Sequence, residues 1–134
     1  MPIAIEQFKM FAGVPWNHSG STQFSPTRLG LVHREPLGVC AQIIPWNAPL
    51  LMFAAKVAPA LAAGNTVVVK PSEIACLSVL EFVDEIADLV PPGVINVVSG
   101  YGPAVGEALV TDSRVRKVAF TGSRPTARRL MEYA

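Results

Sequence analysis

The sequence has few cysteines and few charged residues, which argues against several common classes of protein. Its 134 residues include two cysteines, Cys40 and Cys76, which are too few and too far apart for a disulfide framework or a zinc site. Only 16% of the residues are charged and the formal net charge is +1, so nothing electrostatic favours nucleic acid or an anionic membrane. We therefore expect no metal site, no nucleic-acid partner and no membrane partner.

Long apolar runs and targeting signals are also missing. Residues 48–63 are strongly apolar, but Lys56 and Pro59 interrupt a run that is already shorter than a membrane span. The first residues have neither a basic flank nor an apolar core, so they do not resemble a signal peptide. With reduced cysteines as the default, we expect a soluble, cytoplasmic protein.

What the chain does contain is 51% apolar residues in a regular alternation of short and long segments. Continuous β-branched runs, typical of parallel strands covered on both faces, predict strands at about 38–44, 65–69, 94–98 and 115–120. Helical spacing predicts helices at about 49–63, 75–90, 103–111 and 125–133. The predicted fold class is α/β, a Rossmann-like doubly wound parallel sheet.

Residues 1–36 are predicted to form a region of their own before a sheet domain over 37–134. Helical spacing from Ile5 to Ala12 predicts a helix that Gly13 ends, residues 14–27 read as a loop, and Leu29–Arg34 predicts a strand. The helix over 75–90 is amphipathic. Its predicted core-facing residues are Leu77, Leu80, Val83, Ile86, Ala87 and Val90.

Polar residues follow two of the predicted strands. Asn47 comes after the first strand, where its amide can donate to an oxyanion on a carbonyl substrate, or can merely cap the next helix. Lys70 and Glu73 follow the second strand and can hydrogen-bond the vicinal hydroxyls of a ribose, Lys70 as donor and Glu73 as acceptor. Glu73 would also repel a 2′-phosphate, which favours NAD over NADP. The alternative is a surface ion pair with Ser72 as a helix cap.

Glycines follow the other two strands. Residues 100–106 carry three glycines that permit close backbone approach to a polar cofactor group at a helix start, although the spacing is not Gly-x-Gly-x-x-Gly and a plain turn fits equally well. Residues 120–123 offer a tight turn at Gly122, a helix cap at Ser123 and a flat apolar ring at Phe120 suited to nicotinamide or adenine.

In this order and spacing, the motifs closely resemble the aldehyde dehydrogenase superfamily. The resemblance rests on residues 34–39 (Arg-Glu-Pro-Leu-Gly-Val), 43–47 (Ile-Ile-Pro-Trp-Asn), 58–66, 70–73 (Lys-Pro-Ser-Glu), 92–94 and 118–123 (Val-Ala-Phe-Thr-Gly-Ser). It implies oxidation of an aldehyde with NAD, or less favourably NADP, and homodimers or homotetramers of the full-length protein. Asn47 would be the catalytic oxyanion donor. The implied cofactor-binding residues are Ile44, Pro45, Trp46, Asn47, Lys70, Ser72, Glu73, Gly102, Pro103, Gly106, Phe120, Thr121, Gly122 and Ser123.

The sequence lacks two catalytic elements that the family resemblance would lead us to expect. Residues 1–134 contain neither the family's Glu-Leu-Gly-Gly-Lys segment, which carries the general base, nor a cysteine placed as its nucleophile. We interpret the chain as a fragment without aldehyde oxidation activity of its own. The alternatives are a non-catalytic nucleotide-binding or interaction module derived from the family, or a relative that uses NADP or coenzyme A.

Overall fold

A parallel four-stranded sheet forms the centre of the computed structural model, which describes residues 2–17 and 19–133. Its strands are β3 (Val39–Ile43), β4 (Thr66–Lys70), β5 (Ile95–Val97) and β6 (Val115–Phe120). Their spatial order is β5-β4-β3-β6, and all three pairings are parallel. The predicted fold class, an α/β doubly wound sheet, is confirmed.

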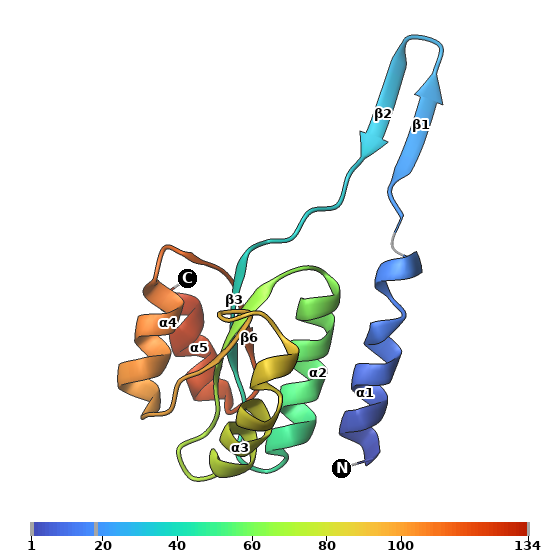
Figure 1. The fold of residues 1–134 in the computed structure, drawn as a ribbon. Coiled ribbons are helices and arrows are strands. Elements are labelled where there is room, and N and C mark those ends of the chain that lie inside the picture. Colours follow the sequence, from blue (N-terminus) through green and yellow to red (C-terminus); the bar gives the residue numbers. More distant parts are fainter. Residues whose placement is uncertain (1, 18, 134) are drawn as a thin grey trace.

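Helices cover both faces of this sheet (Figure 1). One layer holds α2 (Pro49–Ala62) and α3 (Leu77–Glu85), and the other holds α4 (Glu107–Thr111) and α5 (Arg124–Tyr133). The chain runs outward from β3 through β4 to β5, then crosses back to place β6 on the other side of β3. The direction of winding therefore reverses between β3 and β6.

The core lies between the sheet and the layer of α2 and α3. Phe53 and Val57 of α2 are fully buried, and they pack against β-branched residues of β4 such as Val67. Phe53 contacts the ring of Phe82 edge-on at 5.6 Å between centroids. Because α2 presents apolar side chains on nearly every side, it suits a position between the sheet and other helices.

The N-terminal helix α1 (Pro2–Ala12) packs along α2 (Figure 1), and its Phe8 ring lies 6.1 Å from that of Phe82. A 3₁₀ turn over Pro15–Asn17 follows, and then a hairpin of β1 (Ser21–Ser25) and β2 (Arg28–Val32) extends away from the sheet domain. The prediction of a loop over 14–27 was wrong for β1. Both faces of β1 are exposed, so its residues carry none of the apolar alternation that identifies a half-buried strand.

The prediction of the core-facing side of α3 holds at Val83, which packs against the core, but was wrong at Leu77, Leu80 and Ala87, and the helix is shorter than expected. It ends at Glu85, and a separate 3₁₀ turn spans Ala87–Leu89. Leu77 is 72% exposed, whereas Val79, which the prediction left out, is fully buried. Apolar residues recur at helical spacing along two neighbouring stripes of this helix. The stripe through Val79 and Phe82 is buried because docking on α2 and β5 selects it.

Tight turns define where α2 ends and where β6 begins. After α2, the Gly64 N–H donates to Leu61 O (2.9 Å) and the Asn65 N–H to Ala60 O (3.0 Å), with Gly64 at a φ of +77°. This pair of bonds is the Schellman motif, in which glycine takes the left-handed position at lowest cost.

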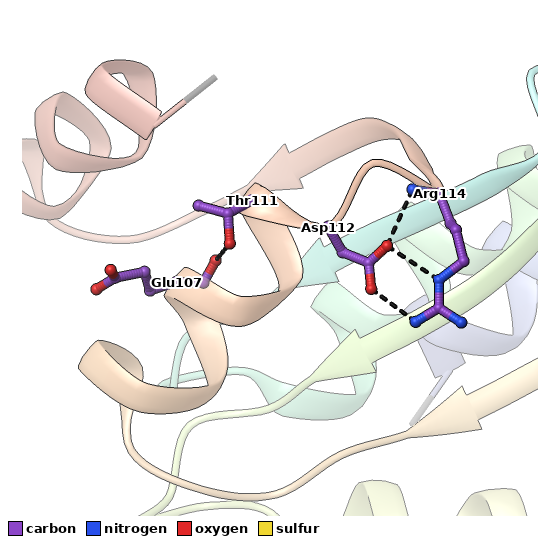
Figure 2. Close-up of polar contacts among 4 residues, drawn as sticks. All are labelled: Glu107, Thr111, Asp112 and Arg114. Atoms are coloured by element: carbon purple, nitrogen blue, oxygen red, sulfur yellow. Dashed lines mark hydrogen bonds and ion pairs between the residues drawn. The ribbon is translucent and has the colours of Figure 1, made fainter.

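Before β6, Asp112 organises the turn that leaves α4 (Figure 2). Its carboxylate accepts from the Arg114 backbone N–H (2.9 Å) and, through both oxygens, from the Arg114 guanidinium at 3.0 and 2.7 Å. These bonds lower the pKa of Asp112 to about 2. On α4, the Thr111 hydroxyl donates to Glu107 O at 2.9 Å.

Candidate functional site

Three strand ends meet at the carboxyl edge of the sheet. Ile43, at the end of β3, is paired with Lys70 of β4 on one side and with Phe120 of β6 on the other. The pairing continues beyond the strands, since the Ile44 N–H donates to Lys70 O and the Thr121 N–H donates to Ile43 O, both at 3.1 Å. In open α/β sheets ligands bind in the crevice at this edge, where the winding reverses.

Asn47 lies on the connection between β3 and α2. The residue that caps α2 is Ala48, and Pro49 occupies the first helical turn, so the alternative in which Asn47 caps this helix was wrong. Asn47 is exposed, as is Trp46 at 62%, while Ile44 is buried beneath them at 2%. The amide of Asn47 is therefore accessible at the edge where the strand ends meet.

Lys70 and Glu73 form an ion pair that is buried on one side only. The Lys70 ammonium donates to Pro71 O at 2.9 Å and lies 3.6 Å from a Glu73 carboxylate oxygen. The Lys70 side chain is 4% exposed and that of Glu73 is 42% exposed. The alternative of a surface pair with Ser72 as helix cap was wrong, because the cap of α3 is Cys76. A fixed ammonium beside an accessible carboxylate offers a donor and an acceptor together.

The glycine segment after β5 forms a π-helical turn, Gly102–Gly106, that leads into α4. Together with α4 and α5 this turn borders an open cavity of about 240 Å³. Gly102, Pro103, Pro125 and Thr126 line it, whereas Gly106 is buried at the junction with α4. Whole ligand pockets run from about 300 to 1,000 Å³, so this cavity suits one ring system of a larger ligand.

The segment after β6 turns tightly into α5. A Cβ on Gly122 would lie 2.5 Å from the Phe120 ring, so the ring closes over this glycine. As predicted, Ser123 caps α5: its hydroxyl is 3.4 Å from the Thr126 N–H and 2.9 Å from the Thr126 hydroxyl. The Phe120 ring thus occupies the space that a side chain at position 122 would need, beside the start of a helix.

Sequence reasoning missed Gln42 as a residue of interest. This side chain lies in the middle of β3 and is 2% exposed, and its amide donates to Lys56 O of α2 at 2.8 Å. Its Oε1 atom is buried without a donor among the described residues. Nearby, burial and then the charge of Lys117 lower the pKa of Lys56. A glutamine inside an apolar strand was the signal that could have identified this position.

Residues 2–17 and 19–133 contain neither a cluster of metal-binding side chains nor a helix that could span a membrane. No group of three or more histidine, cysteine, aspartate or glutamate side chains is placed to hold a metal ion. Within the same residues, every helix is too short or too polar to span a membrane.

The fold and the meeting of its strand ends define a doubly wound α/β domain, the class of fold in which ligands bind at the switch point. Comparison with known proteins is more specific. The model of the aldehyde dehydrogenase family matches residues 1–134, and the chain belongs to that family. The resemblance of its motifs is thereby confirmed.

The similar proteins are much longer than this chain. Fluoroacetaldehyde dehydrogenase of Streptantibioticus cattleyicolor is 50% identical over all of this chain, which spans 27% of that relative. The crystal structure of PnpE in complex with nicotinamide adenine dinucleotide is 46% identical with a TM-score of 0.94, over 98% of this chain and 28% of PnpE. The structure of glyceraldehyde-3-phosphate dehydrogenase GapN from Methanocaldococcus jannaschii, complexed with NADP, is 35% identical with a TM-score of 0.93, over 99% of this chain and 30% of GapN.

Proposed function

We propose that this chain forms the cofactor-binding part of an aldehyde dehydrogenase that oxidises an aldehyde to a carboxylic acid with NAD. The observation that supports the proposal is the meeting of three strand ends, at Ile44–Asn47, Lys70–Glu73 and Phe120–Ser123, through the pairing of Ile43 with Lys70 and Phe120. These ends carry most of the residues that the family resemblance implies.

The residues at this edge fit the parts of a dinucleotide. Lys70 and Glu73 would bind the hydroxyls of the adenosine ribose, with Ser72 in the turn between them. Gly102 and Pro103 would line the adenine cavity, with the buried Gly106 closing the turn behind it.

The remaining residues would contact the rest of the cofactor. Thr121, Gly122 and Ser123 would lie against the pyrophosphate, at the start of α5. Pro45, Trp46 and Phe120 would supply apolar surface for the rings, while Ile44, which is 2% exposed, would contribute little of it. When bound, the nicotinamide supplies an acceptor for the hydride that leaves the aldehyde carbon.

Asn47 is the residue of this chain that we assign to the chemical step. Its exposed amide lies at the switch point and would donate a hydrogen bond to the oxygen of the aldehyde as negative charge develops there. Removing one such donor costs about 100–1,000-fold in turnover in enzymes that use it.

We propose NAD rather than NADP as the cofactor. The Glu73 carboxylate, held 3.6 Å from Lys70, would repel a 2′-phosphate on the ribose. PnpE is described in complex with NAD and GapN with NADP, so both cofactors occur among the similar structures.

A second candidate function is a nucleotide-binding module without chemistry of its own. Two thiols are present, and neither is suited to be the catalytic nucleophile of an aldehyde dehydrogenase. Cys40 is 2% exposed and burial raises the pKa of its thiol, while the Cys76 thiol faces the Glu73 carbonyl oxygen at 4.0 Å. We expect no aldehyde-dependent NADH formation by the 134-residue chain. Such activity, lost in Asn47→Ala, would refute this expectation.

The hairpin of β1 and β2 is the proposed subunit contact of a cytoplasmic homodimer or homotetramer. Phe24 and Leu31 are 82% and 70% exposed on its two strands. An isolated two-stranded hairpin is at best marginally stable in water, so packing against a second subunit would stabilise it. The predicted division at residue 36 would separate this contact region from the cofactor-binding region.

Calorimetric titration of the chain with NAD, NADP and ADP-ribose tests the cofactor site. A hydrogen bond to a charged group contributes about 1.5–3 kcal/mol, so Glu73→Gln should weaken NAD binding by about 10–100-fold. The same change should bring the affinities for NAD and NADP closer together. The matched control is Glu81→Gln, on the exposed side of α3, which should bind NAD like the unaltered chain. Equal NAD affinity in all three proteins would contradict the assignment of Glu73.

A further inference from the structure

The cavity proposed to hold the adenine ring is lined by charged as well as apolar side chains. Pro103, Pro125 and Leu130 give it apolar surface, while Glu107 adds a negative charge to its lining and Arg129 a positive one. Apolar surface alone is enough to stack a flat ring and does not distinguish one purine from another. The charged side chains can make that distinction, because they form hydrogen bonds with the edge of the ring.

A hydrogen bond between two helices positions the Glu107 side chain. The Tyr133 hydroxyl of α5 donates to Oε2 of Glu107, the first residue of α4, at 3.1 Å. This bond raises the pKa of Tyr133, so the hydroxyl keeps its proton and remains a donor at neutral pH. The Glu107 carboxylate points away from Asp112 and Arg114 (Figure 2). Since Tyr133 occupies one site on one oxygen, the carboxylate retains acceptor sites at the cavity wall.

An ionised carboxylate can accept hydrogen bonds but cannot donate them. Adenine carries an amino group, N6, that donates, and ring nitrogens that accept. Glu107 complements the amino group, and the Arg129 guanidinium offers donors for a ring nitrogen. Hypoxanthine has a carbonyl oxygen in place of the amino group, so two acceptors would face each other at Glu107.

We infer that Glu107 determines which purine the cofactor site accepts. Its carboxylate accepts a hydrogen bond from the N6 amino group of adenine and disfavours a base that has a carbonyl oxygen at that position. Tyr133 is a positioning residue that acts through Glu107. This inference rests on the proposed NAD site and adds to it a selectivity for the base.

Calorimetric titration of the chain with NAD and with nicotinamide hypoxanthine dinucleotide tests the inference. The unaltered chain should bind NAD about 10-fold more tightly, as expected for one hydrogen bond to a charged group. Glu107→Gln should bring the two affinities close together, because a side-chain amide both donates and accepts. A merely structural role of Glu107 would weaken both dinucleotides equally, so the ratio of the two affinities is the readout.

Two further variants separate the position of the carboxylate from its charge. Tyr133→Phe removes the donor to Glu107 and keeps the ring, so it should reduce the preference for NAD. Glu132→Gln is the matched control: it removes the same charge from an exposed position of α5 that is not among the residues lining the cavity, and it should keep the preference. Circular dichroism checks that each variant is folded. If Glu107→Gln unfolds the chain, the comparison of Tyr133→Phe with Glu132→Gln decides.

The outcomes distinguish this inference from the proposed cofactor site. Equal affinities of the unaltered chain for the two dinucleotides, or an unchanged ratio in both Glu107→Gln and Tyr133→Phe, would overturn the selectivity of Glu107. An equal loss of preference in Glu132→Gln would overturn it too, because general charge would then be the cause. In each case, weaker NAD binding by Glu73→Gln would still support the cofactor site. Failure of the chain to bind either dinucleotide would overturn both proposals.

Discussion

Gly64→Ala should destabilise this protein more than the same change at another left-handed glycine. Gly64 has a φ of +77° in the turn after α2, and a Cβ there would lie 2.9 Å from the Pro36 ring. Gly93 has a similar φ of +84°, but a Cβ there would meet nothing within 4 Å. Alanine at either position would have the same left-handed backbone strain. Only at Gly64 would its Cβ also press against the Pro36 ring.

The magnitudes follow from these two features. A side chain in the left-handed region costs about 1–2 kcal/mol, and the reduced freedom of the unfolded chain returns about 0.4–1 kcal/mol. Gly93→Ala should therefore cost about 1 kcal/mol. At Gly64 the forced shift of Pro36 adds the cost of overpacking, about 1–3 kcal/mol, for a total of about 2–4 kcal/mol.

Urea unfolding followed by circular dichroism measures both variants. With a slope of about 1–3 kcal/mol per molar urea, Gly64→Ala should lower the midpoint by about 1 M or more and Gly93→Ala by clearly less. Pro36→Ala should recover part of the loss at Gly64 and none of the loss at Gly93. Equal destabilisation of the two glycine variants, or no recovery by Pro36→Ala, would refute the steric argument.

Three other predictions concern the core, an acidic turn and the thiols. Phe53→Ala should cost about 3–5 kcal/mol in the free energy of unfolding because Phe53 is fully buried, whereas Phe24→Ala, at 82% exposure, should cost under about 0.5 kcal/mol. Asp112 has a pKa lowered to about 2, so it stabilises the fold above its ordinary pKa of 3.8, and this contribution is lost as pH falls towards 2. Asp112→Asn should flatten that part of the stability profile. Iodoacetamide should modify Cys76 in the native protein and the buried Cys40 after unfolding, as peptide mass mapping can show.

The strands and the placement of the candidate site residues were predictable from local pattern. Val67 to Val69 form a continuous β-branched run, which is typical of a parallel strand; it is buried at Val67 and Val69 on one face and half-buried at Val68 on the other. Lys70 is the last residue of β4 and Asn47 lies in the connection after β3, and in a parallel sheet all strand ends of one polarity share an edge. The assignment of these residues to a cofactor stays a prediction.

The core-facing side of α3 and the strand β1 were not predictable in the same way. Leu77 and Val79 belong to two apolar stripes of comparable strength, and only docking against the sheet buries one of them. The exposed strand β1 is held by backbone hydrogen bonds to β2, which leave no mark on side-chain composition. The spacing of apolar residues predicts which side of a helix or strand is buried. It predicts nothing for a strand that is exposed on both faces, and it does not choose between two equally apolar sides of a helix.

The sequence by itself determined the class of fold, because the alternation of β-branched runs with helical periods admits few solutions other than parallel strands and covering helices. It also determined which residue types follow each strand. Only the tertiary structure decided that β6 returns to lie beside β3, which brings Phe120 next to Ile43. It also decided that the buried Gln42 Oε1 atom has no donor among the described residues. The physical reason is that strand order depends on backbone pairing between segments far apart in the chain, and those peptide groups are the same in every residue.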